Sequence, residues 1–218
     1  MSPRPRSASN DDILDGVMRA IARVGPARLA LTDVAEETGL APATLIQRFG
    51  SKRGMLLAAL ERGIADAGRR LSEIRAQQQS PVAALVAVAT DAARQGSTPA
   101  AAANHLAFLQ GELDDPEVHR LALERSRRVE AGYRGLIGEA VAAGELAGAD
   151  PGRLARTVHA VVNGSLGQWA VHREGAVLRW VQEDVDAVLA PYRQRAQATP
   201  GQATPGQAAA GPRARHRL

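Results

Sequence analysis

The sequence predicts an all-α fold of about nine helices, in which an N-terminal three-helix domain is followed by a larger helical domain. Hydrophobic residues form 45% of the 218-residue chain but aromatic residues only 3%. Alanine and leucine therefore fill most of the core, which suits closely packed helices. Apolar residues recur at helical spacing and never alternate as in a strand. Serine, aspartate, proline and glycine mark the helix ends.

The first two helices are expected to begin at polar caps. Ser9 precedes Asp12 by three residues, which is the spacing of a capping box, and the helix that follows ends at Gly25. Thr32 is expected to cap a short second helix over residues 33–38.

A tight turn joins the second helix to the third. Gly39 supplies the turn, and Pro42 suits the first position of a third helix that ends at Phe49. Ser51 is expected to cap a long fourth helix that begins at Lys52.

Five more helices are predicted in the rest of the chain. Breaks that contain proline, glycine and aspartate separate them, and two of these breaks place an aspartate directly before a proline, as at many helix starts. The predicted helices lie near residues 81–95, 99–111, 116–143, 151–172 and 176–195.

The excess positive charge of the chain lies at its ends. The formal net charge is +4, with excess arginine at Arg4 and Arg6 and again at Arg213, Arg215 and Arg217. Basic ends favour polyanionic partners, although such tails are as often merely solvated.

Several protein classes find no support in the sequence. Without cysteine there are no disulfides or thiolate metal sites, and the five histidines have no metal-ligand spacing. We recognise no signal peptide, membrane span, phosphate loop or catalytic motif. We therefore expect a cytoplasmic protein that is not an enzyme and uses no cofactor.

Residues 31–56 have the pattern of a helix-turn-helix, because two short helices flank a glycine turn and the second begins with small residues. Small residues let such a helix enter the DNA major groove closely. The predicted outward face of this helix consists of Pro42, Ala43, Thr44, Gln47 and Arg48. Thr44 and Gln47 are able to hydrogen-bond base edges, and Arg48 to reach a base or a phosphate.

This segment resembles the TetR family of transcriptional regulators. The resemblance lies in T-D-V-A-x-x-T-G-L (32–40), P-A-T-L (42–45) and F-G-S-K-R-x-M-L (49–56). It implies a homodimeric, ligand-responsive DNA-binding regulator, most often a repressor that a small molecule releases from its operator. Ile46 stands where the family usually has a phosphate-contacting tyrosine, so that contact is lost or replaced by Gln47 or Arg48.

The expected DNA-binding residues are Thr32, Pro42, Ala43, Thr44, Ile46, Gln47, Arg48 and Lys52. Thr32 and Lys52 lie at helix starts, where they are expected to contact phosphate. The domain organisation that follows is a disordered basic arm (1–9), a helix-turn-helix domain (10–51), an effector-binding and dimerisation domain (52–196) and a disordered tail (197–218).

A pocket in the larger domain is expected around Arg125, which lies on an otherwise apolar helix stripe seven residues after Val118. Arg125 would favour an anionic effector; alternatively it extends to solvent or pairs with an acid. His105, Phe108 and Leu109 form a candidate pocket wall, although a histidine at such a position is more often a hydrogen-bonded core residue than a ligand contact.

The last two helices carry continuous apolar stripes. The resemblance, and the two reading heads that a two-fold operator needs, favour a dimer interface there; alternatively the stripes complete the core of one chain. The candidate interface residues are Leu154, Val158, Val161, Ser165, Trp169, Val181, Val185 and Val188.

Two other functions stay open on the sequence alone. One is a helical small-molecule binding protein or enzyme whose N-terminal helices are only structural. The other is a DNA-binding protein without an effector. The sequence identifies neither an effector nor an operator.

Overall fold

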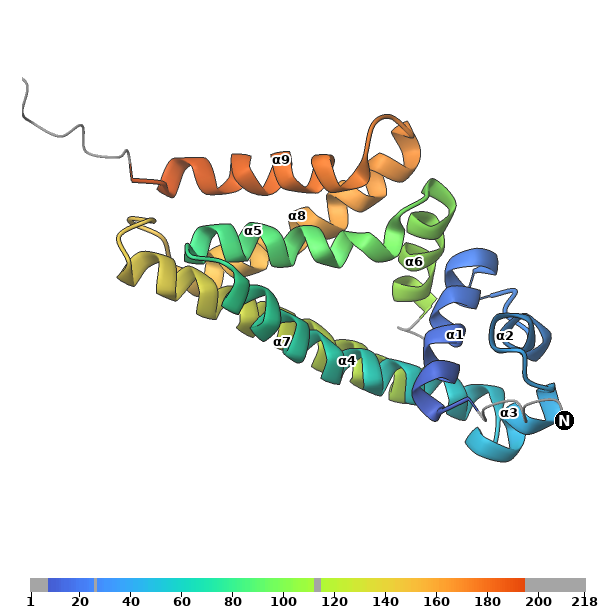
Figure 1. Ribbon diagram of the computed structural model, residues 1–218. Helices are drawn as coiled ribbons and strands as arrows, with labels where there is room; N and C mark the ends of the chain where they lie inside the picture. Colours follow the sequence, from blue (N-terminus) through green and yellow to red (C-terminus); the bar gives the residue numbers. More distant parts are fainter. Residues whose placement is uncertain (1–7, 26, 112–114, 195–218) are drawn as a thin grey trace, which may run out of the picture.

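The computed structural model describes residues 8–25, 27–111 and 115–194. Within them the chain forms nine α-helices and two short 3-10 turns, and no strand (Figure 1). The helices are α1 (Asn10–Val24), α2 (Leu31–Thr38), α3 (Pro42–Phe49), α4 (Lys52–Gln77), α5 (Pro81–Ala92), α6 (Pro99–Gly111), α7 (Pro116–Ala142), α8 (Pro151–His172) and α9 (Val177–Leu189). The predicted all-α fold is confirmed.

Local capping determines most helix ends as expected. Ser9 and Asp12 form the predicted capping box of α1, and the hydroxyl of Ser51 accepts a 2.9 Å hydrogen bond from the Gly54 amide at the start of α4. The 3-10 turns continue α5 over Ala93–Gly96 and α9 over Ala190–Tyr192. These two helices therefore end a few residues earlier than the predicted ranges.

The start of α2 differs from the prediction that Thr32 caps it. The helix begins at Leu31, and Ala30 is the N-cap. The carboxylate of Asp33 accepts a 2.7 Å hydrogen bond from the Ala30 amide. Thr32 therefore lies within the first turn, where its side chain is exposed.

The helices pack around two apolar clusters. The smaller cluster holds α1–α3 against the first half of α4, with the buried side chains of Ile13, Val17 and Leu45 at its centre. The larger cluster joins α5, α7, α8 and α9, and Tyr133 and Ile137 are fully buried in it. The long helices α4 and α7 run side by side between the two ends of the molecule (Figure 1).

The apolar stripes of α8 and α9 pack largely into the core of one chain, which is the alternative that the sequence left open beside a dimer interface. Six of the eight candidate interface residues are buried within the chain, each at most 5% exposed, which leaves little of their area for a contact with a second copy: Leu154, Val158, Ser165, Trp169, Val181 and Val185. Val161 and Val188 are partly buried against the same core. The sequence does not separate these outcomes, because either one requires an apolar stripe.

Two absences hold for the described part of the chain. None of its helices is both long and apolar enough to cross a membrane. Its His, Asp and Glu side chains form no group of three that would hold a metal ion.

Candidate functional site

Helix α3 is anchored by one face and exposes the other. Leu45 is fully buried in the N-terminal cluster, with Phe49 packed partly buried beside it. Gly39 adopts a left-handed conformation, with φ of 70°, which glycine adopts at little cost and which lets the chain turn sharply from α2 into α3. The outward face consists of Pro42, Ala43, Gln47 and Arg48, which are exposed, and Thr44 and Ile46, which are partly exposed.

The junction between α3 and α4 is tight. A Cβ atom on Gly54 would lie 2.4 Å from the carbonyl oxygen of Phe49, so the close approach of the two helices requires glycine there. The partly exposed Lys52 begins α4 directly after this junction. Lys52 is thus only three residues after Phe49, the last residue of the exposed helix α3.

Arg48 makes contacts that the sequence did not indicate. Its guanidinium donates to the backbone carbonyl of Ala8 and lies 3.5 Å from the side-chain oxygen of Asn10. The side chain expected to reach DNA therefore binds the segment that precedes α1.

Ion pairs connect α1 to its neighbours. Arg23 pairs with Asp33, Glu36 and Glu37 on α2. On the other side, Arg62 of α4 pairs with acids of α1. The Arg23 pairs thus join α1 to α2, and the Arg62 pairs join α1 to α4.

His105 of α6 and Arg125 of α7 lie near enough for the charge of Arg125 to act on the imidazole, although neither of the two hollows described below is lined by them. Burial, followed by the nearby positive charge of Arg125, lowers the pKa of His105 from 6.5 to about 4, so the imidazole is neutral at pH 7. Among the described residues the ring of His105 has no hydrogen-bond partner. Phe108 and Leu109 belong to α6, but their side chains lie outside those that the structure describes.

Tyr133 is a further buried side chain of α7 with a polar group. It lies eight residues after Arg125, and burial raises the pKa of its hydroxyl. No described residue forms a hydrogen bond with this hydroxyl, and the ring contacts that of His159 edge-on at 6.3 Å. Sequence reasoning missed Tyr133, although its spacing from Arg125 puts both on one helix face. His159 had no comparable signal, because it comes from α8.

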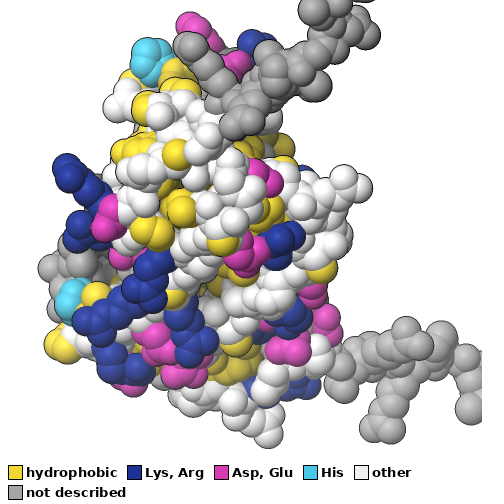
Figure 2. Space-filling view, turned by 90° about the vertical axis from the view of Figure 1, so that its left-hand side faces the viewer, with side chains coloured by type: hydrophobic (Ala, Val, Ile, Leu, Met, Phe, Trp, Pro, Cys, Tyr) yellow, Lys and Arg dark blue, Asp and Glu magenta, His cyan; other side chains and the backbone are white. Residues whose placement is uncertain are grey.

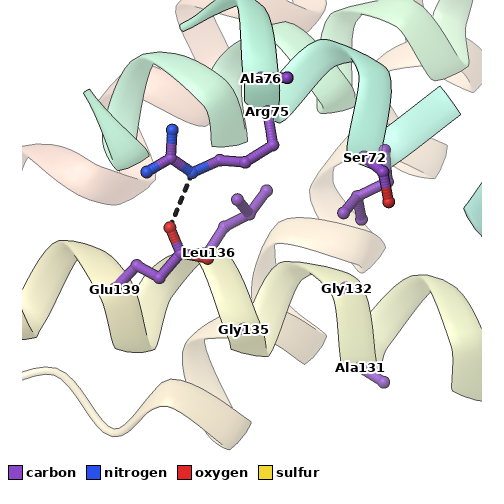
Figure 3. Close-up of a pocket in the computed structure, with 9 residues that line it drawn as sticks. Ser72, Arg75, Ala76, Ala131, Gly132, Gly135, Leu136 and Glu139 are labelled. Carbon is purple, nitrogen blue, oxygen red and sulfur yellow. Dashed lines mark hydrogen bonds and ion pairs between the residues drawn. The ribbon is translucent and has the colours of Figure 1, made fainter. Parts of the chain in front are cut away.

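An open groove of about 550 Å³ lies between α4 and α7 on the outer side of the larger helical domain, called the body below (Figure 3). Gly132 and Gly135 leave α7 without side chains there, and the 2.7 Å ion pair between Arg75 and Glu139 bridges the two helices across it. A second hollow, of about 370 Å³, lies further along α7 beside Arg120 and Arg127.

One face of the molecule shows many arginine side chains with acidic ones among them, so its charge is mixed (Figure 2).

Two polar contacts connect the body to the N-terminal unit. The side-chain amide of Asn104, next to His105 on α6, donates to the carbonyls of Ala22 and Arg23 at 2.9 and 3.4 Å and so covers the end of α1. Arg53, beside Lys52, binds both carboxylate oxygens of Asp115 at 2.9 Å.

Arg53 also binds Glu117 at 2.8 Å, and this set of contacts ties the start of α4 to the start of α7. The guanidinium, together with two backbone amides, lowers the pKa of Asp115 to about 2. The carboxylate thus stays charged over the whole neutral range.

Comparisons with known proteins place these features in context. Residues 13–59 match the family described as bacterial regulatory proteins, tetR family. The HTH-type transcriptional regulator BetI of Brucella canis is 27% identical over 121 residues, which cover 54% of this chain and 60% of that protein. The chain thus aligns with only about 60% of the length of the curated relatives it matches.

Solved structures share the fold over most of the chain. SmeT, the repressor of the Stenotrophomonas maltophilia multidrug efflux pump SmeDEF, is 24% identical with a TM-score of 0.64, covering 90% of this chain and 96% of its own. A putative transcriptional regulator from Saccharomonospora viridis in complex with choline is 22% identical with a TM-score of 0.69, covering 85% of this chain and 98% of its own.

Proposed function

Because the chain belongs to the tetR family of bacterial regulatory proteins, we propose that it is a homodimeric transcription repressor that a small molecule releases from operator DNA. The observation that carries this proposal is the exposed face of α3. Small residues begin the helix, polar side chains follow, and Lys52 lies just beyond it. A buried Leu45 holds this face outward.

On DNA, Thr44 and Gln47 read base edges in the major groove, and Thr32 and Lys52 hold phosphates. A dimer presents two such helices to half-sites one helical turn apart, about 34 Å. Ile46 contributes no hydrogen bond, so its role is apolar contact.

In the body, the effector binds at the face formed by His105 and Arg125, and Arg125 pairs with an anionic group of the effector. The neutral His105 supports this assignment because it is able to donate or accept a hydrogen bond without a charge of its own. A regulator of the same fold has been solved in complex with choline, so this architecture accommodates a small organic molecule.

Release follows from the two contacts that join the body to the reading helices. Movement of α6 displaces the end of α1 through Asn104, and movement of α7 displaces the start of α4 through Arg53. A tenfold loss of operator affinity needs about 1.4 kcal/mol of coupling, which is within the usual allosteric range.

The test is direct binding of the full-length protein to the DNA that flanks its own gene, measured by mobility shift over a range of salt concentrations. We expect a retarded dimer complex that survives an excess of random DNA and weakens linearly in log affinity against log salt. Equal affinity for flanking and random DNA would contradict an operator-specific regulator, and absence of binding would contradict the DNA-binding function.

The effector is tested by screening carboxylate and other anionic metabolites for loss of the DNA complex, with the Arg125→Ala variant as the control. We expect this variant to bind DNA like the wild type and to respond less to any compound that releases the wild type. An unchanged response of the variant would place the effector elsewhere in the body.

A further inference from the structure

Arg53 lies in the first turn of α4, directly after the junction with α3, at one end of the molecule (Figure 1). Its side chain is 52% exposed, and its neighbour along the chain is Lys52, the expected phosphate contact. Adjacent Cα atoms are about 3.8 Å apart, and a DNA strand carries one phosphate per about 3.4 Å of helix axis. A strand that contacts Lys52 therefore also brings phosphates within reach of the longer Arg53 side chain.

Two carboxylates of α7 hold the guanidinium of Arg53. Its Nε and Nη2 atoms donate to the two oxygens of Asp115, each at 2.9 Å, and Nη1 donates to Glu117 at 2.8 Å. The two acids are 34% and 49% exposed, so water screens these contacts, and ion pairs of this kind contribute little to stability. A phosphate binds a guanidinium with the same paired hydrogen bonds as a carboxylate. It is therefore a fitting replacement for Asp115.

DNA at this end of the molecule acts on both partners of the ion pair. Asp115 and Glu117 together carry two negative charges, of which Arg53 neutralises one. An approaching phosphate attracts the guanidinium and repels the two carboxylates. Both forces favour separation of Arg53 from α7.

We propose that Arg53 exchanges Asp115 and Glu117 for a DNA phosphate when α3 binds its half-site, so that the start of α4 separates from the start of α7. This inference rests on the proposed DNA-binding function. Because linkage is reciprocal, an effector that returns the two carboxylates to Arg53 takes a phosphate contact from the operator. The acids of α7 thus compete with DNA for one cation.

Arg75 and Glu139 form a matched ion pair between the same two helices. The Nε atom of Arg75 donates to Glu139 at 2.7 Å (Figure 3). Glu139 is 48% exposed, against 49% for Glu117, so water screens the two acids equally. Arg75 lies about 33 Å further along α4 than Arg53 at the usual helical rise, and thus far from α3. Removing the charge of either glutamate changes the net charge equally, and only the distance from the DNA differs.

The experiment measures affinity over a range of salt concentrations on a duplex that the full-length wild type selects from a random pool. Asp115 stays unchanged, because its side chain also caps α7 by accepting from the amides of Glu117 and Val118. We expect E117Q to bind about two- to fivefold more tightly than the wild type, because less competes with the phosphate for Arg53. R53Q should reduce the slope of log affinity against log salt by about one unit. The controls R75Q and E139Q should behave as the wild type does.

The R53Q/E117Q variant separates the exchange from a general effect of charge. If E117Q strengthens binding by freeing Arg53, the gain disappears in the background that lacks this arginine. A gain that persisted there would come from the lost negative charge alone, and the exchange would be wrong. An R53Q variant with lower affinity and an unchanged salt slope would make Arg53 a residue that only positions α4.

The Nε–H resonance of Arg53 reports the exchange directly. Arg53 and Arg75 each donate through Nε to a carboxylate, and R53Q and R75Q identify the two signals in isotope-labelled protein. We expect the Arg53 signal to shift when the selected duplex binds and the Arg75 signal to stay in place. An unshifted Arg53 signal in the DNA complex would overturn the proposal. If the wild type selected no duplex at all, the DNA-binding function would fail instead.

Discussion

Gln47 and Lys52 lie within six positions of each other, yet their surroundings suit Gln47 to a contact with a base and Lys52 to a contact with a phosphate. Gln47 is exposed in the middle of α3, where an amide is able to pair with an adenine edge. Lys52 is at the start of α4, where an ammonium group meets phosphate.

We expect Gln47→Ala to lose about 1–3 kcal/mol on a DNA duplex that the wild type selects from a random pool, and to relax the base preference at one position. Lys52→Ala should instead weaken selected and random DNA alike and reduce the salt slope by about one unit. Fluorescence anisotropy on both DNAs measures each quantity. If the two variants lost affinity equally on both DNAs, the division of tasks between base and phosphate would be wrong.

His105 should make the free energy of unfolding depend on pH in the acid range. Its folded pKa is about 4 and the ordinary value is 6.5, so between these values the unfolded chain binds more protons than the folded one. Stability therefore falls as the pH drops from 6.5 towards 4, by about 1–3 kcal/mol in this component after allowance for partial solvent access.

Urea denaturation of the wild type and of His105→Gln between pH 7.5 and 4.5 isolates this contribution. Carboxylates titrate in both proteins, so only the difference between them reports on His105. We expect the two stability curves to converge as the pH falls. Parallel curves would show that burial does not suppress protonation of this ring.

At the scale of the helix, the close contact between α3 and α4 depends on one glycine. Gly54→Ala places a Cβ atom 2.4 Å from the Phe49 carbonyl oxygen, so α3 must move. We expect a loss of about 1–3 kcal/mol in stability and a clear loss of operator affinity. Urea denaturation and DNA binding by the same variant measure both.

Gly63→Ala on the same helix is the control, because a Cβ atom there meets nothing within 4 Å. Alanine in an open helix interior should stabilise the protein by about 0.5–1 kcal/mol and leave DNA binding unchanged. Equal behaviour of the two variants would mean that the α3–α4 contact has no role in placing the reading helix.

Local sequence signals predict helix ends well and contacts between distant segments poorly. Ser9 and Ser51 cap their helices as expected, because each acts within three residues of its own position. Thr32 and Asp33 both favour a helix start, but the backbone path makes Ala30 the N-cap and leaves Asp33 to accept from its amide. The Arg53 contacts with Asp115 and Glu117 join residues more than sixty positions apart, and no helical period indicates such a pair.

The candidate site divides in the same way. The outward face of α3 was predictable, because burial of Leu45 determines which residues point away from the core. The proximity of His105 to Arg125 could be proposed only as two separate helix faces, since it depends on tertiary packing. Arg48 shows the limit, as its contact with Ala8 spans forty positions.

For the whole molecule, the burial of the α8 and α9 stripes moves the expected dimer contact to the outer faces of these helices. Exposed or partly exposed residues recur at helical spacing along the outer face of α8, and most are small: Thr157, Ala160, Gly164, Gln168 and Val171. Val171 is 75% exposed, more than any other large hydrophobic residue recorded in the described part of the chain. Small side chains allow two helices to approach closely, which a four-helix dimer contact requires.

A substitution at Gly164 should disturb a dimer contact without disturbing the folding of the single chain. A Cβ atom there meets nothing within 4 Å in the single chain, so Gly164→Arg should fold as the wild type does, with a small loss for the glycine environment. In a close contact between two copies the same side chain has no room, and its charge has no solvent. We therefore expect a folded monomer that loses operator affinity steeply, because one reading head holds only one half-site.

Gly68→Arg on α4 is the matched control, since that glycine is also exposed and open and the change in charge is identical. It should stay dimeric.

Val185→Asp, by contrast, buries a charge in the core of the chain and should lower the unfolding temperature instead of producing folded monomers. Sedimentation at micromolar concentration together with thermal denaturation distinguishes the three results. A Gly164→Arg protein that stayed dimeric would place the contact between copies on another face, because an arginine at a two-fold helix contact meets its own copy across the axis.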